Sequence, residues 1–226
     1  MAMTVQVADT GECPSAWWSN DAALAALPWW RHDERVVTDG QIGALHADGR
    51  IEIERGRTAA DDVWLHLASV LPTLPWSEVR LIRADWEWPR AISVPGAVLV
   101  ASTVDVTTRS WALLYLIHEA LHQWIGGVVA RPTDHSEAAW MEAWVDAATW
   151  RAVEEVHPSA RAAFESLFAR YHATDERREH ARRVAAARAQ LLSTSDLSTR
   201  LAPFVDGVAR GTRAVFRLTD WNTRRA

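Results

Sequence analysis

Two histidines four residues apart constrain this chain more than any other feature. His118 and His122 lie in an apolar run, residues 111–127, that contains no proline and ends in Gly126-Gly127. The run predicts one buried helix that stops at the two glycines. Because residues i and i+4 share one face of a helix, the two imidazoles should point to the same place. This spacing is typical of a metal site.

Three carboxylates extend the predicted site. Glu119 lies about 100° round the helix from His118, close enough to act on a water at the metal without being a ligand. Glu142 follows His122 after 19 residues, positions 123 to 141, and is the expected third ligand. Asp146 is again at i+4, so it can orient a histidine from behind. This donor set favours Zn²⁺. The other interpretation is a hydrogen-bonded histidine pair on a core helix.

Length and composition limit the function classes. With 226 residues the chain predicts a single domain, 1–226, which is β-rich to about residue 105 and helical from about residue 106. The formal charge of −5 argues against nucleic-acid or anionic-membrane partners. All 24 basic residues are arginines, which excludes Schiff-base and phosphate-loop lysines, and the single Cys13 excludes an internal disulfide. Without a signal segment or an apolar span of about 20 residues, a cytoplasmic location is expected.

Hydrophobic patterning predicts an α+β fold with a small mixed or antiparallel sheet and a mainly helical C-terminal half. Period-two segments separated by Asp39-Gly40 and Asp48-Gly49 predict a three-stranded meander over residues 34–55. Thr58 to Asp61 resembles a capping box that begins a helix. The remaining expectations are strands at 78–84 and 97–102, helices at 136–156 and 174–192, a helix after Pro158 with Phe164, Leu167, Phe168 and Tyr171, and a tail broken by Pro203, Gly207 and Gly211.

The segment His118 to Gly126, HEALHQWIG, resembles the H-E-L-A-H-Q-W-F-G of the aminopeptidase N family of gluzincins. WMEAW, residues 140–144, is similar to that family's W-L-N-E-G-F, with one residue absorbed between them. The gap to Glu142 and the E-A-x-x-D run are closer to thermolysin. The resemblance covers about residues 78–146 and implies a zincin-like catalytic domain. In zincins the strand at 97–102 would form the sheet edge, where an extended peptide can bind.

The chain departs from this family at two positions. The family sequence G-A-M-E-N-P-G carries a Glu that binds the substrate's free amine, and Ser93 stands at that place here. A family Tyr stabilises the oxyanion, and its best match is Phe204, which has no hydroxyl. Tyr171 is our candidate replacement, with ordinary packing as the alternative. Further candidate donors are His172, His157, His135 and Tyr115, and Trp124 and Trp144 are near enough to the ligands to line a pocket.

These residues together predict a zinc metallopeptidase of the gluzincin type, with Glu119 as general base and a peptide or amide as substrate. Two other classes stay open. One is a zinc enzyme of the same fold that acts on a non-peptide small molecule. The other is a non-catalytic protein in which zinc is structural. The substrate and the oligomeric state do not follow from the sequence.

Overall fold

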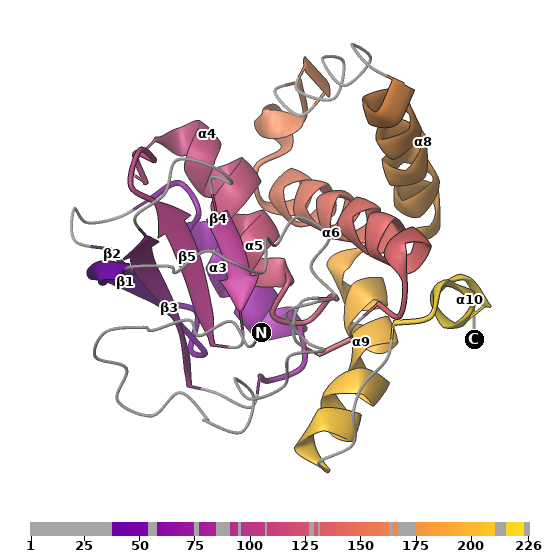
Figure 1. Cartoon of the computed structure of the whole chain (residues 1–226), viewed down its shortest axis with the longest axis horizontal. Helices are drawn as coiled ribbons and strands as arrows, with labels where there is room; N and C mark the ends of the chain where they lie inside the picture. Colours follow the sequence, from indigo (N-terminus) through magenta and orange to yellow (C-terminus); the bar gives the residue numbers. More distant parts are fainter. Residues whose placement is uncertain are drawn as a thin grey trace, which may run out of the picture.

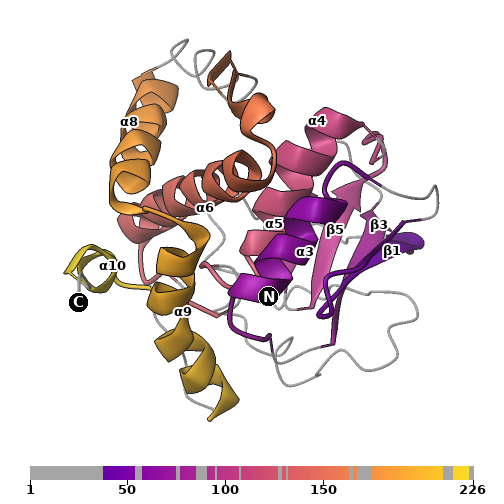
Figure 2. The same ribbon diagram turned by 180° about the vertical axis from the view of Figure 1, so that it is seen from behind.

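A computed structural model describes residues 38–53, 58–74, 77–84, 91–94, 96–106, 108–126, 129–130, 132–162, 165–166, 175–210 and 216–223. These residues form a mixed α+β structure, as predicted (Figure 1). The sheet lies on one side of the molecule, and most of the C-terminal helices lie on the other. The view from behind shows the same division (Figure 2).

The sheet has five strands among the described residues, in the order β2-β1-β3-β5-β4. The strands are β1 (Thr38–His46), β2 (Ile51–Ile53), β3 (Glu78–Ala84), β4 (Ala91–Val94) and β5 (Ala97–Ala101). Only β3 and β5 pair in parallel, so the sheet is mixed. The prediction that residues 97–102 form the sheet edge is wrong, because β5 lies between β3 and β4. The end strand is β4, which was not predicted as a strand.

The predicted meander is partly wrong. Asp48-Gly49 forms the turn of the β1–β2 hairpin, with Gly49 at φ +90°. Asp39-Gly40 lies inside β1 instead of forming a second turn, because β1 continues its pairing with β3 through a register shift between Thr38 and Gly40. Pairing between strands therefore overrode the local preference of this dipeptide for a turn. Residues 34–37 of the predicted first strand lie outside the described residues.

The histidine-bearing helix is composite. It begins as α4 (Arg109–Trp111), continues as a π-helical segment, η1 (Ala112–Leu116), and ends as α5 (Ile117–Leu121). The predicted end at Gly126-Gly127 is therefore wrong by several residues. Gln123, in the turn that follows, is fully buried and its side-chain amide donates to Val94 O and accepts from Gly96 N. These bonds attach the end of the helix to β4 and the turn before β5.

The longest helix, α6 (His135–Val156), begins where the sequence predicted. Asp134 is its N-cap, and the Asp134 side chain accepts a hydrogen bond from Glu137 N at 2.9 Å. Eleven of its residues are buried. α6 packs against α3 (Asp61–Val70), α5 and the helices that follow, so it is the central element of the core.

The C-terminal helices are α8 (Asp175–Gln190), α9 (Thr194–Ala209) and α10 (Leu218–Thr223), after a short 3-10 turn, η2 (Pro158–Ala160). The prediction of an irregular tail is wrong, because Pro203 and Gly207 lie inside α9. Leu197 and Leu201 are fully buried on α9, and this packing outweighs the two helix-breaking residues. None of the helices in the described ranges has the length and apolar character needed to cross a membrane.

Candidate metal centre

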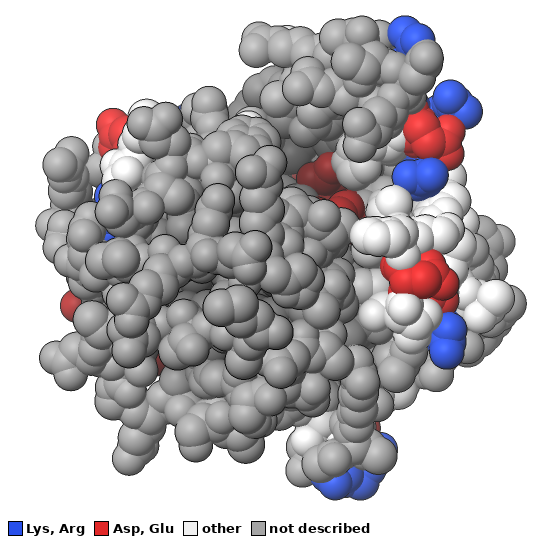
Figure 3. Space-filling model, viewed as in Figure 1, with Lys and Arg blue, Asp and Glu red and all other residues white. Residues whose placement is uncertain are grey.

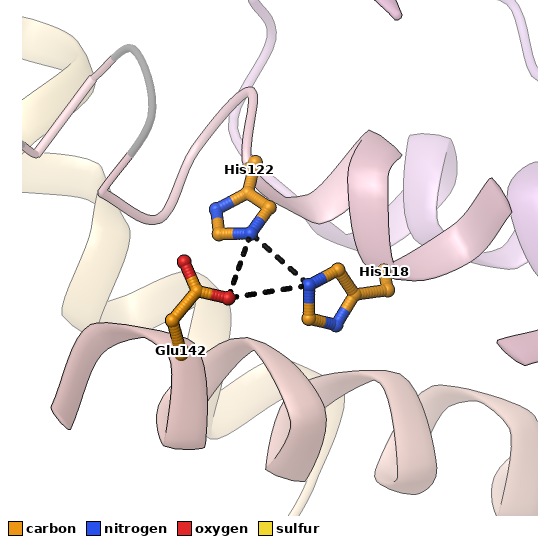
Figure 4. Close-up of side chains that lie close together, drawn as sticks. All are labelled: His118, His122 and Glu142. Carbon is orange, nitrogen blue, oxygen red and sulfur yellow. Dashed lines mark hydrogen bonds and ion pairs between the residues drawn. The ribbon is translucent and has the colours of Figure 1, made fainter. Parts of the chain in front are cut away.

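His118 of α5 and His122, the residue that caps the end of α5, face Glu142 of α6 across a short gap (Figure 4). The two Nε2 atoms lie 3.1 Å apart, and each lies 3.5 Å from Glu142 Oε2. The predicted ligand set is therefore assembled in space from two helices that are separate in the sequence. Figure 3 shows acidic side chains deep in a recess of the molecular surface.

The spacing of the three atoms fits a metal ion. Two ligand atoms that are each about 2.1 Å from a tetrahedral ion lie about 3.4 Å from one another. The observed separations are 3.1, 3.5 and 3.5 Å. The second carboxylate oxygen, Glu142 Oε1, is buried and has no hydrogen-bond partner within the described part of the chain. His118, His122 and Glu142 could therefore hold a metal ion.

The second ring nitrogen of each histidine is already engaged. His118 Nδ1 lies 2.9 Å from Asp146 Oδ1, and His122 Nδ1 lies 3.0 Å from the Ile125 carbonyl. Carboxylate and carbonyl oxygens accept, so both Nδ1 atoms carry the hydrogen. In the neutral rings the two Nε2 atoms then present lone pairs to each other, and only a shared proton or a cation satisfies both. Asp146 lies behind His118, as the sequence predicted.

The charges at the site are strongly coupled. Burial alone would lower the pKa of His118, but Asp146 and Glu142 raise it well above its ordinary value. His122 is also buried, and Glu142 raises its pKa. Burial alone would raise the pKa of Glu142, yet the two imidazoles lower it to about 2. A negative pocket that already stabilises positive charge on its imidazoles is suited to a divalent cation.

Glu119 is buried, with 9% of its surface exposed. Burial raises its pKa, whereas the charges of His118 and His122 lower it. Ser93 of β4 is 5% exposed, and its hydroxyl donates to the Glu119 carbonyl. β4 therefore lies directly beside the general-base candidate.

Of the candidate oxyanion donors, the structure describes His135, His157 and Tyr115. Tyr171 and His172 lie outside the described residues. His135 is exposed at the start of α6, and His157 caps its end. Tyr115 packs half-buried against the hydrophobic core. Phe204 stacks on Trp221 with ring centroids 5.9 Å apart, inside the C-terminal core.

The two tryptophans considered for a substrate pocket belong to the core. Trp124 is 3% exposed, packs on Trp64 at 5.7 Å and donates its indole N–H to the Pro72 carbonyl. Trp144 is fully buried and packs on Trp221 at 5.3 Å. Both side chains therefore stabilise the fold around the centre.

One residue at the centre was missed from the sequence. His180 of α8 places Nε2 2.7 Å from Asp146 Oδ2, so that Asp146 contacts two imidazoles. In the sequence, His180 stands in a charged helix and is paired by spacing with Glu176, whose side chain lies outside the described residues. No local spacing relates position 180 to position 146, so only the packing of α8 on α6 reveals this contact.

Comparison with known proteins adds no relative: no protein-family model, curated protein or solved structure matches the chain.

Proposed function

We propose that this protein is a zinc-dependent hydrolase that cleaves peptide or amide bonds, with His118, His122 and Glu142 as the metal ligands. The triangle of ligand atoms, with sides of 3.1 to 3.5 Å, is the observation on which the proposal depends. Two nitrogens and one carboxylate favour zinc over harder cations. When bound, zinc would lower the pKa of a water molecule and polarise the substrate carbonyl.

Glu119 supplies the proton transfer in this proposal. Its carboxylate accepts a proton from the attacking water and returns it to the nitrogen of the leaving amine. Burial and the raised pKa of Glu119 suit both halves of this task, because the group must hold the proton before giving it up. Asp146 keeps the Nδ1 proton on His118, so that the Nε2 lone pair faces the metal.

The position of Ser93 favours a second substrate class. In the family that the sequence resembles, the residue at this place binds a free amine with a carboxylate. Here a buried hydroxyl is bonded to the backbone of Glu119. A substrate without a free α-amine, either an internal peptide bond or a non-peptide small molecule, therefore fits this position better than an aminopeptidase substrate does.

Glu119→Gln tests the function directly. The variant should bind zinc as the wild type does and lose at least about 100-fold in kcat, because the base is removed while the ligands are kept. Glu165→Gln is the matched control, since Glu165 is exposed and pairs with Arg161. Hydrolysis is measured on peptides with free and blocked N-termini. Full activity in Glu119→Gln would contradict the proposal.

If the zinc-loaded wild type cleaves none of these peptides, the same assay on small-molecule amides and esters decides between the non-peptide enzyme and a structural zinc site. A structural site predicts no turnover of any substrate and no dependence on Glu119.

A further inference from the structure

We propose that His180 is a positioning residue for the metal centre: it fixes the Asp146 carboxylate, and through it His118, and so sets how tightly the metal is held. The inference rests on the proposed function in assuming that the metal binds at all. It adds a residue from a third helix, α8, to a centre otherwise built from α5 and α6.

The geometry makes Asp146 a bridge. Its Oδ1 lies 2.9 Å from His118 Nδ1, and its Oδ2 lies 2.7 Å from His180 Nε2. An ionised carboxylate can only accept, so both ring nitrogens donate to it. Distances of this length are typical of charge-assisted hydrogen bonds. Each oxygen of Asp146 is therefore used by a different imidazole.

His180 acts through Asp146 and not as a ligand. The group that could hold a metal consists of His118, His122 and Glu142. The His180 side chain is 26% exposed, whereas those of Asp146 and His118 are 18% and 17% exposed. It thus stands on the outer side of the bridge, where it shields one carboxylate oxygen from solvent.

The hydrogen bond from His180 restricts the orientation of the Asp146 carboxylate, which also accepts the hydrogen bond from His118. With His118 alone, the Asp146 carboxylate could rotate and exchange its free oxygen with water. The bond from His180 holds the carboxylate plane, which keeps the proton on His118 Nδ1 and directs Nε2 to the metal. Mutation of a residue that orients a metal ligand through a hydrogen bond typically lowers metal affinity about 10-fold to about 100-fold.

α8 has enough other contacts to keep its place without this bond. Arg188 lies over the Trp150 ring at 3.4 Å, and Val184 and Ala187 are buried. Glu179 of α8 also pairs with Arg182 and Arg183. Loss of the His180 bond should therefore affect the centre more than the docking of α8.

The test measures metal affinity by competition with a chelator and records the visible spectrum of the Co²⁺-loaded protein. His180→Leu should bind zinc about 10-fold more weakly and shift the Co²⁺ bands. His180→Gln, which keeps an N–H donor at a similar reach, should recover most of the affinity. His135→Leu is the control, because His135 is exposed on α6 and lies outside the ligand group.

A double-mutant cycle shows whether His180 acts through Asp146. In an Asp146→Ala background, His180→Leu should cost no further affinity, since the bridge is already absent. An equal loss in both backgrounds would overturn the proposal, and so would unchanged zinc affinity in His180→Leu. If the wild type itself binds no metal, the proposed function fails instead.

A measurement on the wild type alone covers the case in which His180→Leu does not fold. Zinc should slow amide hydrogen exchange around His180 in α8, because metal binding and the His180 bond stabilise each other. Unchanged exchange in α8, with slowed exchange in α5, would overturn the inference.

Discussion

At the scale of single residues, the centre is defined by which ring nitrogen of each histidine already makes a hydrogen bond within the protein. The Asp146 carboxylate accepts a hydrogen bond from His118 Nδ1, and the Ile125 carbonyl accepts one from His122 Nδ1. Both Nε2 atoms are therefore left to face a cation. The i,i+4 spacings of His118 with His122, and of Glu142 with Asp146, predicted that the two imidazoles point to one place and that Asp146 lies behind a histidine, because a helix fixes such neighbours locally. His180 could not be predicted, since its contact depends on how two helices pack.

The raised pKa values of His118 and His122 give the affinity for zinc a defined pH dependence. Any proton held at the two Nε2 atoms must leave before they bind metal, so zinc binding should tighten as the pH rises from the ordinary value of 6.5 through the raised values. The slope should be about 10-fold per pH unit for each proton released. Chelator competition between about pH 6 and about pH 8.5 measures it. A flat profile above pH 6.5 would contradict the shifts.

The same shifts predict that stability depends on pH differently with and without metal. In the metal-free protein the contribution of protonated His118 is complete below pH 6.5 and is lost as the pH rises through its raised pKa. Glu142 contributes above pH 4.5, and its contribution is lost as the pH falls towards about 2. Zinc replaces the proton on the imidazoles, so the zinc-bound protein should keep its stability at higher pH.

At the scale of elements, the centre depends on how closely the end of the histidine helix approaches α6. Gly126 has φ +79°, and a Cβ built on it would lie 1.6 Å from Met141 Sδ. Met141 directly precedes the candidate ligand Glu142. The absence of a side chain at Gly126 therefore leaves room for the buried Met141 side chain between α6 and the turn after α5.

Gly126→Ala should therefore weaken both the fold and the metal site. The positive φ alone costs about 1 to 3 kcal/mol, and the overlap displaces the buried Met141 side chain, which is next to Glu142 on α6. Urea unfolding and zinc titration measure the two effects. The control is Gly207→Ala, since Gly207 lies within α9. Wild-type zinc affinity in Gly126→Ala would show that α6 does not respond to this contact.

Some helices and strands could be predicted from sequence patterns alone, and others could not. β3 and α6 were predicted closely, because β3 alternates clearly and α6 begins at a strong N-cap, Asp134. β4 was missed because four buried residues show no alternation. The helical course of α9 through Pro203 was missed because packing against other helices stabilises it, and packing has no local signal.

At the scale of the whole molecule, α9 and α10 pack against α6 through Trp144. Arg200 of α9 is 3% exposed and lies over the Trp144 ring at 5.4 Å. Its guanidinium also donates to the carbonyls of Gln190 and Trp221, at the ends of other helices. Trp144 stands between Glu142 and Asp146 in the sequence of α6. The Arg200 side chain therefore connects α9 to the part of α6 that carries these two carboxylates.

Arg200→Leu should destabilise the protein by about 3 to 5 kcal/mol, because it leaves buried carbonyls without donors and removes the pair with Asp196. Arg200→Lys should recover little, since a single ammonium cannot reach both carbonyls. Arg182→Leu is the control, because Arg182 is 72% exposed and its pair with Glu179 contributes little. Equal unfolding midpoints for the leucine variants at 200 and 182 would contradict this role.

The π-helical segment η1 has a consequence for how chain length can vary here. A π turn holds one residue more than an α turn, so Ala112–Leu116 accommodates what amounts to a one-residue insertion directly before Ile117 and His118. Trp111 and Ile117 are both buried at its ends. A chain shortened by one residue within this segment could wind as plain α-helix and still bury both ends. The segment can thus absorb a change of length while the spacing from His118 to His122 stays fixed.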